Sequence, residues 1–247
     1  MADSNGLPGR VVPAVLTFAT TALLVFGGAS CSSDPVSTEP TSIDTTTDTT
    51  TVTTPIESTP IESTPLESIP TASALTDDEV AGLLWMREEE QLAHDVYVVL
   101  GDLWGLRIFE NIAASETTHI EAVSDLLARY GIDDPADGAA PGTFTNPTLQ
   151  GLYDQLIADG SQSLDAALGV GALIEELDIS DLQARSDATE IPEITTVYAN
   201  LLRGSRNHLR AFTSQLELRG TTYEPTQLDS ATYDAIVSSE TERGPAD

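Results

Sequence analysis

A glutamate and a histidine stand within an otherwise apolar helical stripe near the middle of the chain. Core-type residues recur there at spacings of three and four, which places on one helical face Phe109, Ile112, Glu116, His119, Ile120, Val123, Leu126, Leu127 and Tyr130. Glu116 and His119 thus occupy positions where Leu or Ile would be expected, and burying an unpaired carboxylate is costly. A Glu-x-x-His pair facing the interior of a helical bundle presents two ligands to one metal ion. The pattern therefore predicts a metal site in a helical core.

A third ligand is expected from the run Glu88-Glu89-Glu90 in the preceding helical segment. Periodicity alone favours Glu89, because Trp85, Leu92 and Val96 flank it on the same face. Hairpin geometry favours Glu90. If the turn between the two helices centres near residue 103, Glu90 and Glu116 each lie thirteen residues from it, and antiparallel helices bring them level.

The second half of the chain repeats this logic. Glu175 shares an apolar face with Leu168, Gly171, Ile179 and Leu182, and Glu176 competes with it for the inward position. Further on, His208 aligns with Leu201, Ser205 and Phe212. Two of the three histidines of the chain therefore fall at stripe positions. The predicted metal-ligating residues are Glu90, Glu116, His119, Glu175, Glu176 and His208.

Helical segments with recognisable start and stop signals position these residues. Thr76-Asp-Asp-Glu79 reads as a capping box for a helix running to about Leu100 and stopping at Gly101. Further helices are expected over about 105–130, 147–159, 163–184, 192–219 and 230–238, with Asn146-Pro147 capping the third. Sustained period-two alternation is lacking, so essentially no sheet is expected. The predicted fold class is all-α, a four-helix bundle with extra short helices.

Several of these motifs resemble a known superfamily. The run Glu90-Gln-Leu-Ala-His-Asp-Val-Tyr97 is similar to the first helix of ferritins, bacterioferritins and rubrerythrins. An uncharacterised ferritin-like family of bacteria and archaea is resembled over about 75–240 by four segments together, Met86–Glu90, Ser115–His119, Ile174–Asp178 and Gly204–His208. That resemblance implies a metal-carboxylate bundle. Carboxylate and imidazole ligands favour iron, with manganese as an alternative. If two metals bind, Glu116 would bridge them, and the reaction would be oxidation of the metal by dioxygen or peroxide.

One departure from the ferritin-like pattern concerns the last long helix, which should also carry Glu-x-x-His. Here the sequence is Ser205-Arg-Asn-His208, so the fourth carboxylate is missing. A one-metal site, or a di-metal site completed by Asp178, Glu176 or water, is compatible with this sequence. The alternative function is a non-catalytic binding or envelope-structural module whose inward polar residues pair with one another.

The N-terminal part of the chain reads as an export signal followed by a spacer. Arg10 precedes the apolar run 11–26, and Gly28-Ala-Ser-Cys31 then resembles the lipobox of bacterial lipoproteins, in which the Cys is lipidated. That family usually has Leu where Gly28 stands, so cleavage elsewhere or an uncleaved anchor stays open. Residues 1–31 are thus expected to direct export and anchoring at the outer face of the cytoplasmic membrane or in the cell envelope.

Residues 32–74 are built from Thr, Ser, Pro, acidic residues and a few aliphatics, with a Thr-Pro-Ile/Leu-Glu-Ser repeat occurring three times over 54–68. Regular proline excludes helix, and too little apolar surface is present to offset ordering entropy. This segment is expected to be a disordered tether, and residues 241–247 a disordered tail. The ferritin-like domain is placed between them, over 75–240.

The charge of the chain limits its partners. It has 40 acidic residues against 10 basic ones, all of them Arg, for a net charge of −30. Such a chain offers no basic patch for nucleic acid but favours local accumulation of cations. The expected partners are metal ions and, through lipidated Cys31, the membrane, while a homodimer stays open. Because Cys31 is the only cysteine, no intramolecular disulfide can form.

Overall fold

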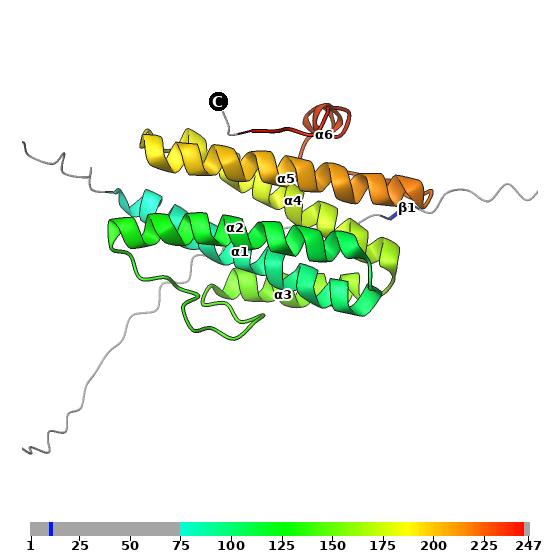
Figure 1. Ribbon diagram of the computed structural model, residues 1–247, viewed down its shortest axis with the longest axis horizontal. Coiled ribbons are helices and arrows are strands. Elements are labelled where there is room, and N and C mark those ends of the chain that lie inside the picture. Colours follow the sequence, from blue (N-terminus) through cyan, green and yellow to red (C-terminus); the bar gives the residue numbers. More distant parts are fainter. Residues whose placement is uncertain (1–9, 12–74, 245–247) are drawn as a thin grey trace, which may run out of the picture. The chain divides into compact units, whose positions relative to one another are not determined.

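Four long helices carry the fold of the computed structural model, which describes residues 10–11 and 75–244 (Figure 1). Helices α1 (Asp77–Trp104) and α2 (Arg107–Tyr130) form one antiparallel hairpin, and α4 (Leu164–Asp187) and α5 (Pro192–Leu218) form a second. The hairpins meet through α1 against α4 and α2 against α5. Helix α3 (Pro147–Gly160) packs on α1 and α4, and α6 (Ser230–Val237) packs on α5. The expected all-α bundle with extra short helices is confirmed.

The β-structure of the described residues is confined to one short ladder. Strands β1 (Arg10–Val11) and β2 (Thr222–Tyr223) pair in parallel, with Arg10 opposite Thr222 and Val11 opposite Tyr223. The structure does not describe residues 1–9, 12–74 and 245–247. The predicted lipidation site at Cys31, the predicted tether and most of the predicted export signal therefore lie outside the described residues. Within the described part of the chain, no helix combines the length and hydrophobicity needed to cross a bilayer.

Helix boundaries follow the capping chemistry of the sequence, with one exception. Thr76 and Glu79 form the expected capping box at the start of α1. However, α1 does not stop at Gly101, as its sequence suggested, but continues to Trp104 and ends at Gly105, which adopts the left-handed conformation (φ 65°). Gly101 is a packing residue instead, because a Cβ there would lie 3.2 Å from the Cβ of Phe109 on α2. Its missing side chain lets the two helices approach closely.

The long connection between α2 and α3 is fastened to α1 by three buried charged residues. Arg87 donates to Asp134 through Nε at 2.8 Å, and Asp95 accepts the Gly142 backbone N–H at 2.7 Å. Glu88 accepts the backbone N–H of Thr145 and that of Asn146, the residue that caps α3. Buried charge on this side of α1 therefore has a structural purpose, separate from the inward face that carries Glu90.

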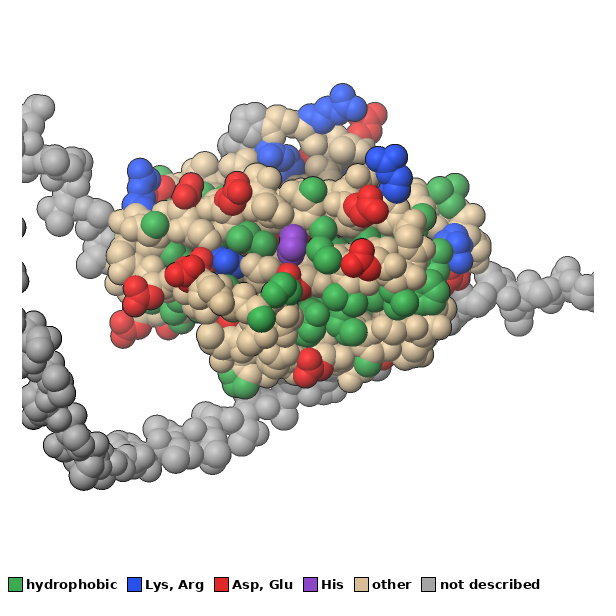
Figure 2. Space-filling view, turned by 60° about the horizontal axis from the view of Figure 1, so that its bottom comes forward, with side chains coloured by type: hydrophobic (Ala, Val, Ile, Leu, Met, Phe, Trp, Pro, Cys, Tyr) green, Lys and Arg blue, Asp and Glu red, His purple; other side chains and the backbone are tan. Residues whose placement is uncertain are grey.

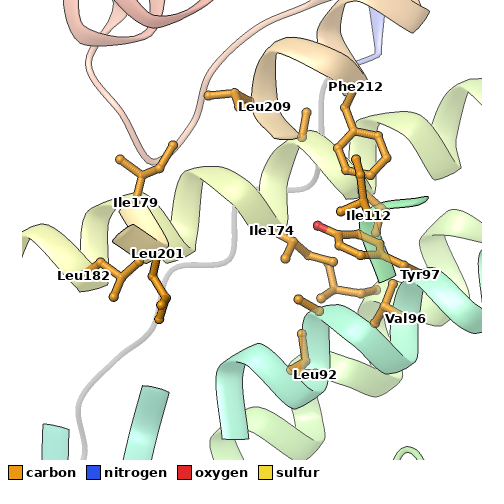
Figure 3. Close-up of a cluster of buried hydrophobic side chains, with 14 of the residues drawn as sticks. Leu92, Val96, Tyr97, Ile112, Ile174, Ile179, Leu182, Leu201, Leu209 and Phe212 are labelled. Atoms are coloured by element: carbon orange, nitrogen blue, oxygen red, sulfur yellow. The ribbon is translucent and has the colours of Figure 1, made fainter. Parts of the chain in front are cut away.

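The apolar core of the bundle is one cluster, and Figure 3 shows two sets of side chains within it. One contains Tyr97 and Phe212, which with Phe109 form an aromatic cluster with ring centroids 5.2–6.4 Å apart. The other contains Ile179, Leu182 and Leu201. Along α4 and α5, Glu175 and His208 lie between these groups in the sequence. Apolar side chains thus flank the polar residues of the core along both helices.

Negative charge is not concentrated on the face of the domain shown in Figure 2. Acidic side chains are scattered over the face shown in Figure 2, with apolar and neutral side chains between them. Dispersed exposed carboxylates favour solubility and attract cations weakly over a broad area. The candidate site for a specific cation lies in the buried interior instead.

Candidate metal centre

Five buried side chains from all four long helices converge in the interior of the bundle. Glu90 of α1 joins Glu116 and His119 of α2 in one group, in which a ligand atom from each residue lies within 4.8 Å of the others. Glu116 also belongs to a second such group with Glu175 of α4 and His208 of α5. Each of the five is at most 8% exposed. The two groups share Glu116 and form one continuous cluster.

The two histidines direct the same ring nitrogen at the carboxylates. His119 Nδ1 lies 2.6 Å from Glu116 Oε2 and 3.2 Å from Glu90 Oε2. His208 Nδ1 lies 2.9 Å from Glu116 Oε1 and 3.5 Å from Glu175 Oε2. The imidazole rings stack with centroids 5.6 Å apart. Glu116 therefore presents one carboxylate oxygen to each histidine, an arrangement suited to a carboxylate that bridges two ions.

Several atoms of this cluster that could bind a metal ion are buried without a hydrogen-bond partner. They are Glu90 Oε1, Glu116 Oε1, His208 Nδ1 and, beside the cluster, Asp178 Oδ1. Glu116 Oε1 and His208 Nδ1 are close, yet their orientation does not meet hydrogen-bond geometry. Buried polar atoms are nearly always satisfied in native proteins, so orphaned atoms that converge on one region need another partner. A cation would satisfy them, and the residues present fit one.

The protonation of the cluster reflects its crowding with carboxylates. Burial works against ionisation of Glu116, but His208 and His119 outweigh it and lower the pKa of that carboxyl. Burial raises the pKa of Glu90 to about 7 despite the opposing effect of His119. Burial disfavours the charged form of His208, yet Glu116 and Glu175 raise the pKa of this imidazole to about 10. The metal-free cluster therefore retains protons that a divalent cation would displace.

Asp178 lies where the sequence lacks the fourth carboxylate. It stands one turn beyond Glu175 on α4, and its Oδ2 accepts a hydrogen bond from Ser205 Oγ on α5. Both residues are buried, and burial together with nearby Glu90 and Glu89 raises the pKa of Asp178 well above its ordinary value. The carboxylate of Asp178 on α4 thus contacts Ser205, the α5 residue that stands where the sequence pattern suggested a glutamate.

Neighbouring side chains fix the orientation of the cluster. Tyr97 donates its hydroxyl to Glu175 Oε1 at 2.5 Å, and Ser115 Oγ lies 3.0 Å from His208 Nε2. On α5, Gly204 leaves room for His119, because a Cβ at that position would lie 2.5 Å from His119 Nε2. Such supporting contacts select the ring orientation that turns Nδ1 toward the carboxylates.

The family model for an uncharacterized protein domain, DUF2202, matches residues 79–240, the part of the chain that holds the bundle and the cluster. The chain belongs to the DUF2202 family. The uncharacterized protein MJ0754 of Methanocaldococcus jannaschii is 47% identical over 170 residues, which cover 69% of this chain and 92% of that protein. The crystal structure of the hypothetical protein MJ0754 gives a TM-score of 0.68 at 45% identity, covering 71% of this chain and 100% of that one. The DUF2202 domain thus accounts for the helical architecture of residues 79–240.

Glu176 does not join the cluster of the DUF2202 domain, although the sequence admitted it as a ligand. It accepts the backbone N–H groups of Thr226, Gln227 and Leu228 at 2.8–3.0 Å, together with the hydroxyl of Tyr223. Consecutive residues of an α-helix point about 100° apart, so Glu175 and Glu176 cannot serve the same site. Glu176 instead fastens the segment after β2 to α4.

The same rotation separates Glu88, Glu89 and Glu90. Glu88 anchors the connection before α3, Glu89 accepts the indole N–H of Trp85 at 3.0 Å, and only Glu90 reaches His119. Hairpin geometry therefore selected the member of this run that joins the cluster. His94, one turn from Glu90, lies outside the cluster, with its Nδ1 2.9 Å from Asp95 Oδ1.

Adjacent glutamates on α4 provide a matched test of these assignments. We expect Glu176→Gln to destabilise the fold by about 2 kcal/mol, because charged acceptors make the stronger hydrogen bonds to backbone N–H groups, and to leave metal affinity unchanged. Glu175→Gln should weaken metal binding at least about tenfold, because it removes an anionic ligand. Urea unfolding and metal titration of both variants measure the two effects. The reverse result, with metal affinity lost only in Glu176→Gln, would exchange their roles.

Sequence reasoning did not find Gly204 or Ser115 as supports of the cluster, because glycine and serine in a helix carry no periodic signal. The usable signal was proximity in sequence. Gly204 stands four residues before His208, and Ser115 directly precedes Glu116.

Proposed function

We propose that this chain is a ferritin-like metal-binding protein that holds two iron ions, with manganese as the alternative. The observation that supports it is the pair of buried ligand groups joined by Glu116. Carboxylates with imidazole and no thiolate suit iron or manganese, and ligands projecting inward from four helices are the arrangement used for such centres in bundles. Glu90 and His119 would hold one ion, Glu175 and His208 the other, and Glu116 both, with Asp178 within reach.

The residues around the ions would prepare the site for redox chemistry. Two bound ferrous ions would supply two electrons, enough to reduce dioxygen to hydrogen peroxide or hydrogen peroxide to water. Tyr97 holds Glu175 in place, and Ser115 holds His208. The protons held by the cluster would leave when cations bind, and apolar side chains flank the site along α4 and α5.

Metal stoichiometry tests this proposal directly. Anaerobic titration of chelator-treated protein with ferrous ion should reach two ions per chain, one for each ligand group. In Glu116→Gln at least one ion should be lost, because the shared carboxylate no longer bridges. Glu176→Gln is the matched control and should keep the full stoichiometry. Failure of the parent to bind iron or manganese at micromolar concentration would leave the cluster as a scaffold of paired charges.

We also infer that the protein is exported and held at the cell surface by lipid on Cys31, with residues 32–74 as a tether. This rests on the signal-like sequence before Cys31 and on the composition of the tether.

Cys31→Ser should move the protein from the membrane fraction of expressing bacteria to the soluble fraction or the medium, because no acyl chain can then be attached. Immunoblots of the fractions measure the change. Ser32→Ala, next to the lipidation site, is the control that should stay membrane-bound. Unchanged membrane retention of Cys31→Ser would contradict the lipid anchor.

A further inference from the structure

A pocket of about 420 Å³ between α2 and α5 leads to the histidine side of the cluster. His119 and His208 line it, together with the polar side chains of Ser115 and Asn207. Its remaining wall comes from a third source, the segment after α6, through Glu242 and Gly244. The DUF2202 match ends at residue 240, so this wall lies beyond the family domain.

The segment 240–244 contacts α5 mainly through Glu242. Glu242 accepts hydrogen bonds from Arg206 at 2.7 and 2.5 Å and from Arg210 at 2.8 Å. Its backbone N–H and carbonyl both bond to the side chain of Asn207, and Arg203 donates to the carbonyl of Gly244. The hydrogen bonds from Arg206 and Arg210 hold the pKa of Glu242 at about 2 despite partial burial, so the carboxylate stays ionised. The sequence predicted a disordered tail here, whereas residues 241–244 make specific contacts with α5, which we call the latch.

The charge around the pocket mouth is unusual for this chain. Three of the ten arginines, Arg203, Arg206 and Arg210, lie within eight residues of α5, and no acidic residue occurs on this helix between Glu193 and Glu217. Arg206 and Arg210 pair with Glu242, and Arg203 lines the pocket itself, so the three arginines outnumber the one carboxylate here in a chain of net charge −30. Such a rim disfavours entry of a divalent cation but does not repel a small neutral molecule.

We propose that this pocket is the access route by which a small neutral oxidant, dioxygen or hydrogen peroxide, reaches the metal centre, and that the segment 240–244, latched by Glu242, controls its width. The identity of the oxidant rests on the proposed metal function, whereas control of the pocket width by the segment 240–244 does not. Opening requires release of the Glu242 contacts, which frees the wall formed by Glu242 and Gly244 and leaves the α2 and α5 walls in place. The polar lining can hydrogen-bond a peroxide on its way to the histidines.

A thiol placed in the pocket tests the latch without metal. In full-length protein carrying Cys31→Ser and Ser115→Cys, the single thiol should react slowly with iodoacetamide. Adding Glu242→Ala should raise this rate about tenfold, because charge-assisted hydrogen bonds no longer oppose local opening. Glu240→Ala, which removes the same charge from an exposed position of the segment, should leave the rate unchanged. A thiol introduced by Thr148→Cys on the exposed surface of α3 serves as the reference for intrinsic reactivity.

The metal-loaded protein tests the route. With ferrous ion in the site and Ser115 intact, anaerobic stopped-flow absorbance should show binding of nitric oxide, a small neutral probe, about tenfold faster in Glu242→Ala than in the parent or in Glu240→Ala. If ferrous ion binds and Glu242→Ala changes neither the nitric oxide rate nor the thiol rate, the latch is wrong. If the thiol rate rises but ferrous ion does not bind, the metal proposal and with it the oxidant route are wrong, while the latch is right.

Discussion

Ferrous or manganous ion should raise the melting temperature of the parent protein by about 10 °C, and Glu116→Ala should abolish the rise. At an ion concentration about a thousand times the dissociation constant, binding to the native state alone adds about 4 kcal/mol of stability. For a domain of this size each kcal/mol corresponds to about 2–4 °C. Glu116 contributes to both ligand groups, so its loss removes more of the site than any other single change. Calorimetric scans with chelator and with excess metal measure the difference.

The test depends on the difference between the melting temperatures with metal and with chelator, and not on either melting temperature alone. Glu116 pairs with both histidines, so Glu116→Ala should also lower the melting temperature in chelator by leaving buried imidazoles unpaired. Glu176→Gln provides the matched control, since it should lower the melting temperature in chelator and still show the full rise with metal. An unmoved parent curve together with a strong loss in Glu116→Ala would make the cluster a structural ion-pair network.

Much of this site could be predicted because the spacing of apolar residues in a helix shows which face of the helix is buried. The stripe on α2 placed Glu116 and His119 inward, and the distance of Glu90 and Glu116 from the hairpin turn brought them together across α1 and α2. Capping chemistry placed the start of α1 at Thr76 and that of α3 at Asn146. These signals are local or nearly local, so one sequence is enough to interpret them.

The remaining features depend on tertiary contacts that leave no periodic trace. Glu175 and Glu176 differ only by their rotation about α4, and the backbone N–H groups that hold Glu176 come from residues about fifty positions later. Gly101 reads as a helix stop but serves close packing against Phe109. Glu242 lies in a polar tail and gains its partners only because α6 returns the chain to α5.

Gly204→Ala should lower metal affinity about a hundredfold, although Gly204 contributes no metal ligand itself. A methyl group at this position would lie 2.5 and 2.6 Å from Nε2 and Cε1 of His119, closer than van der Waals contact permits. The α5 backbone is held by helix hydrogen bonds, so the imidazole must rotate away, and Nδ1 then leaves Glu116 and Glu90. Losses of this size are typical when the support of a metal-ligating histidine is disturbed. Ferrous titration of the variant measures the affinity.

Two comparisons separate this effect from a general change in the helix. Gly151→Ala on α3 has no atom within 4 Å of the added methyl group, so it should stabilise the fold by about 0.5–1 kcal/mol through helix propensity and leave metal affinity unchanged. In a His119→Ala background the clash disappears, so Gly204→Ala should cause no further loss of affinity, and the two changes should be strongly non-additive. Additive losses would mean that Gly204 acts through the backbone of α5. Full affinity in the single variant would remove His119 from the set of ligands, because its Nδ1 cannot stay in place beside the new methyl group.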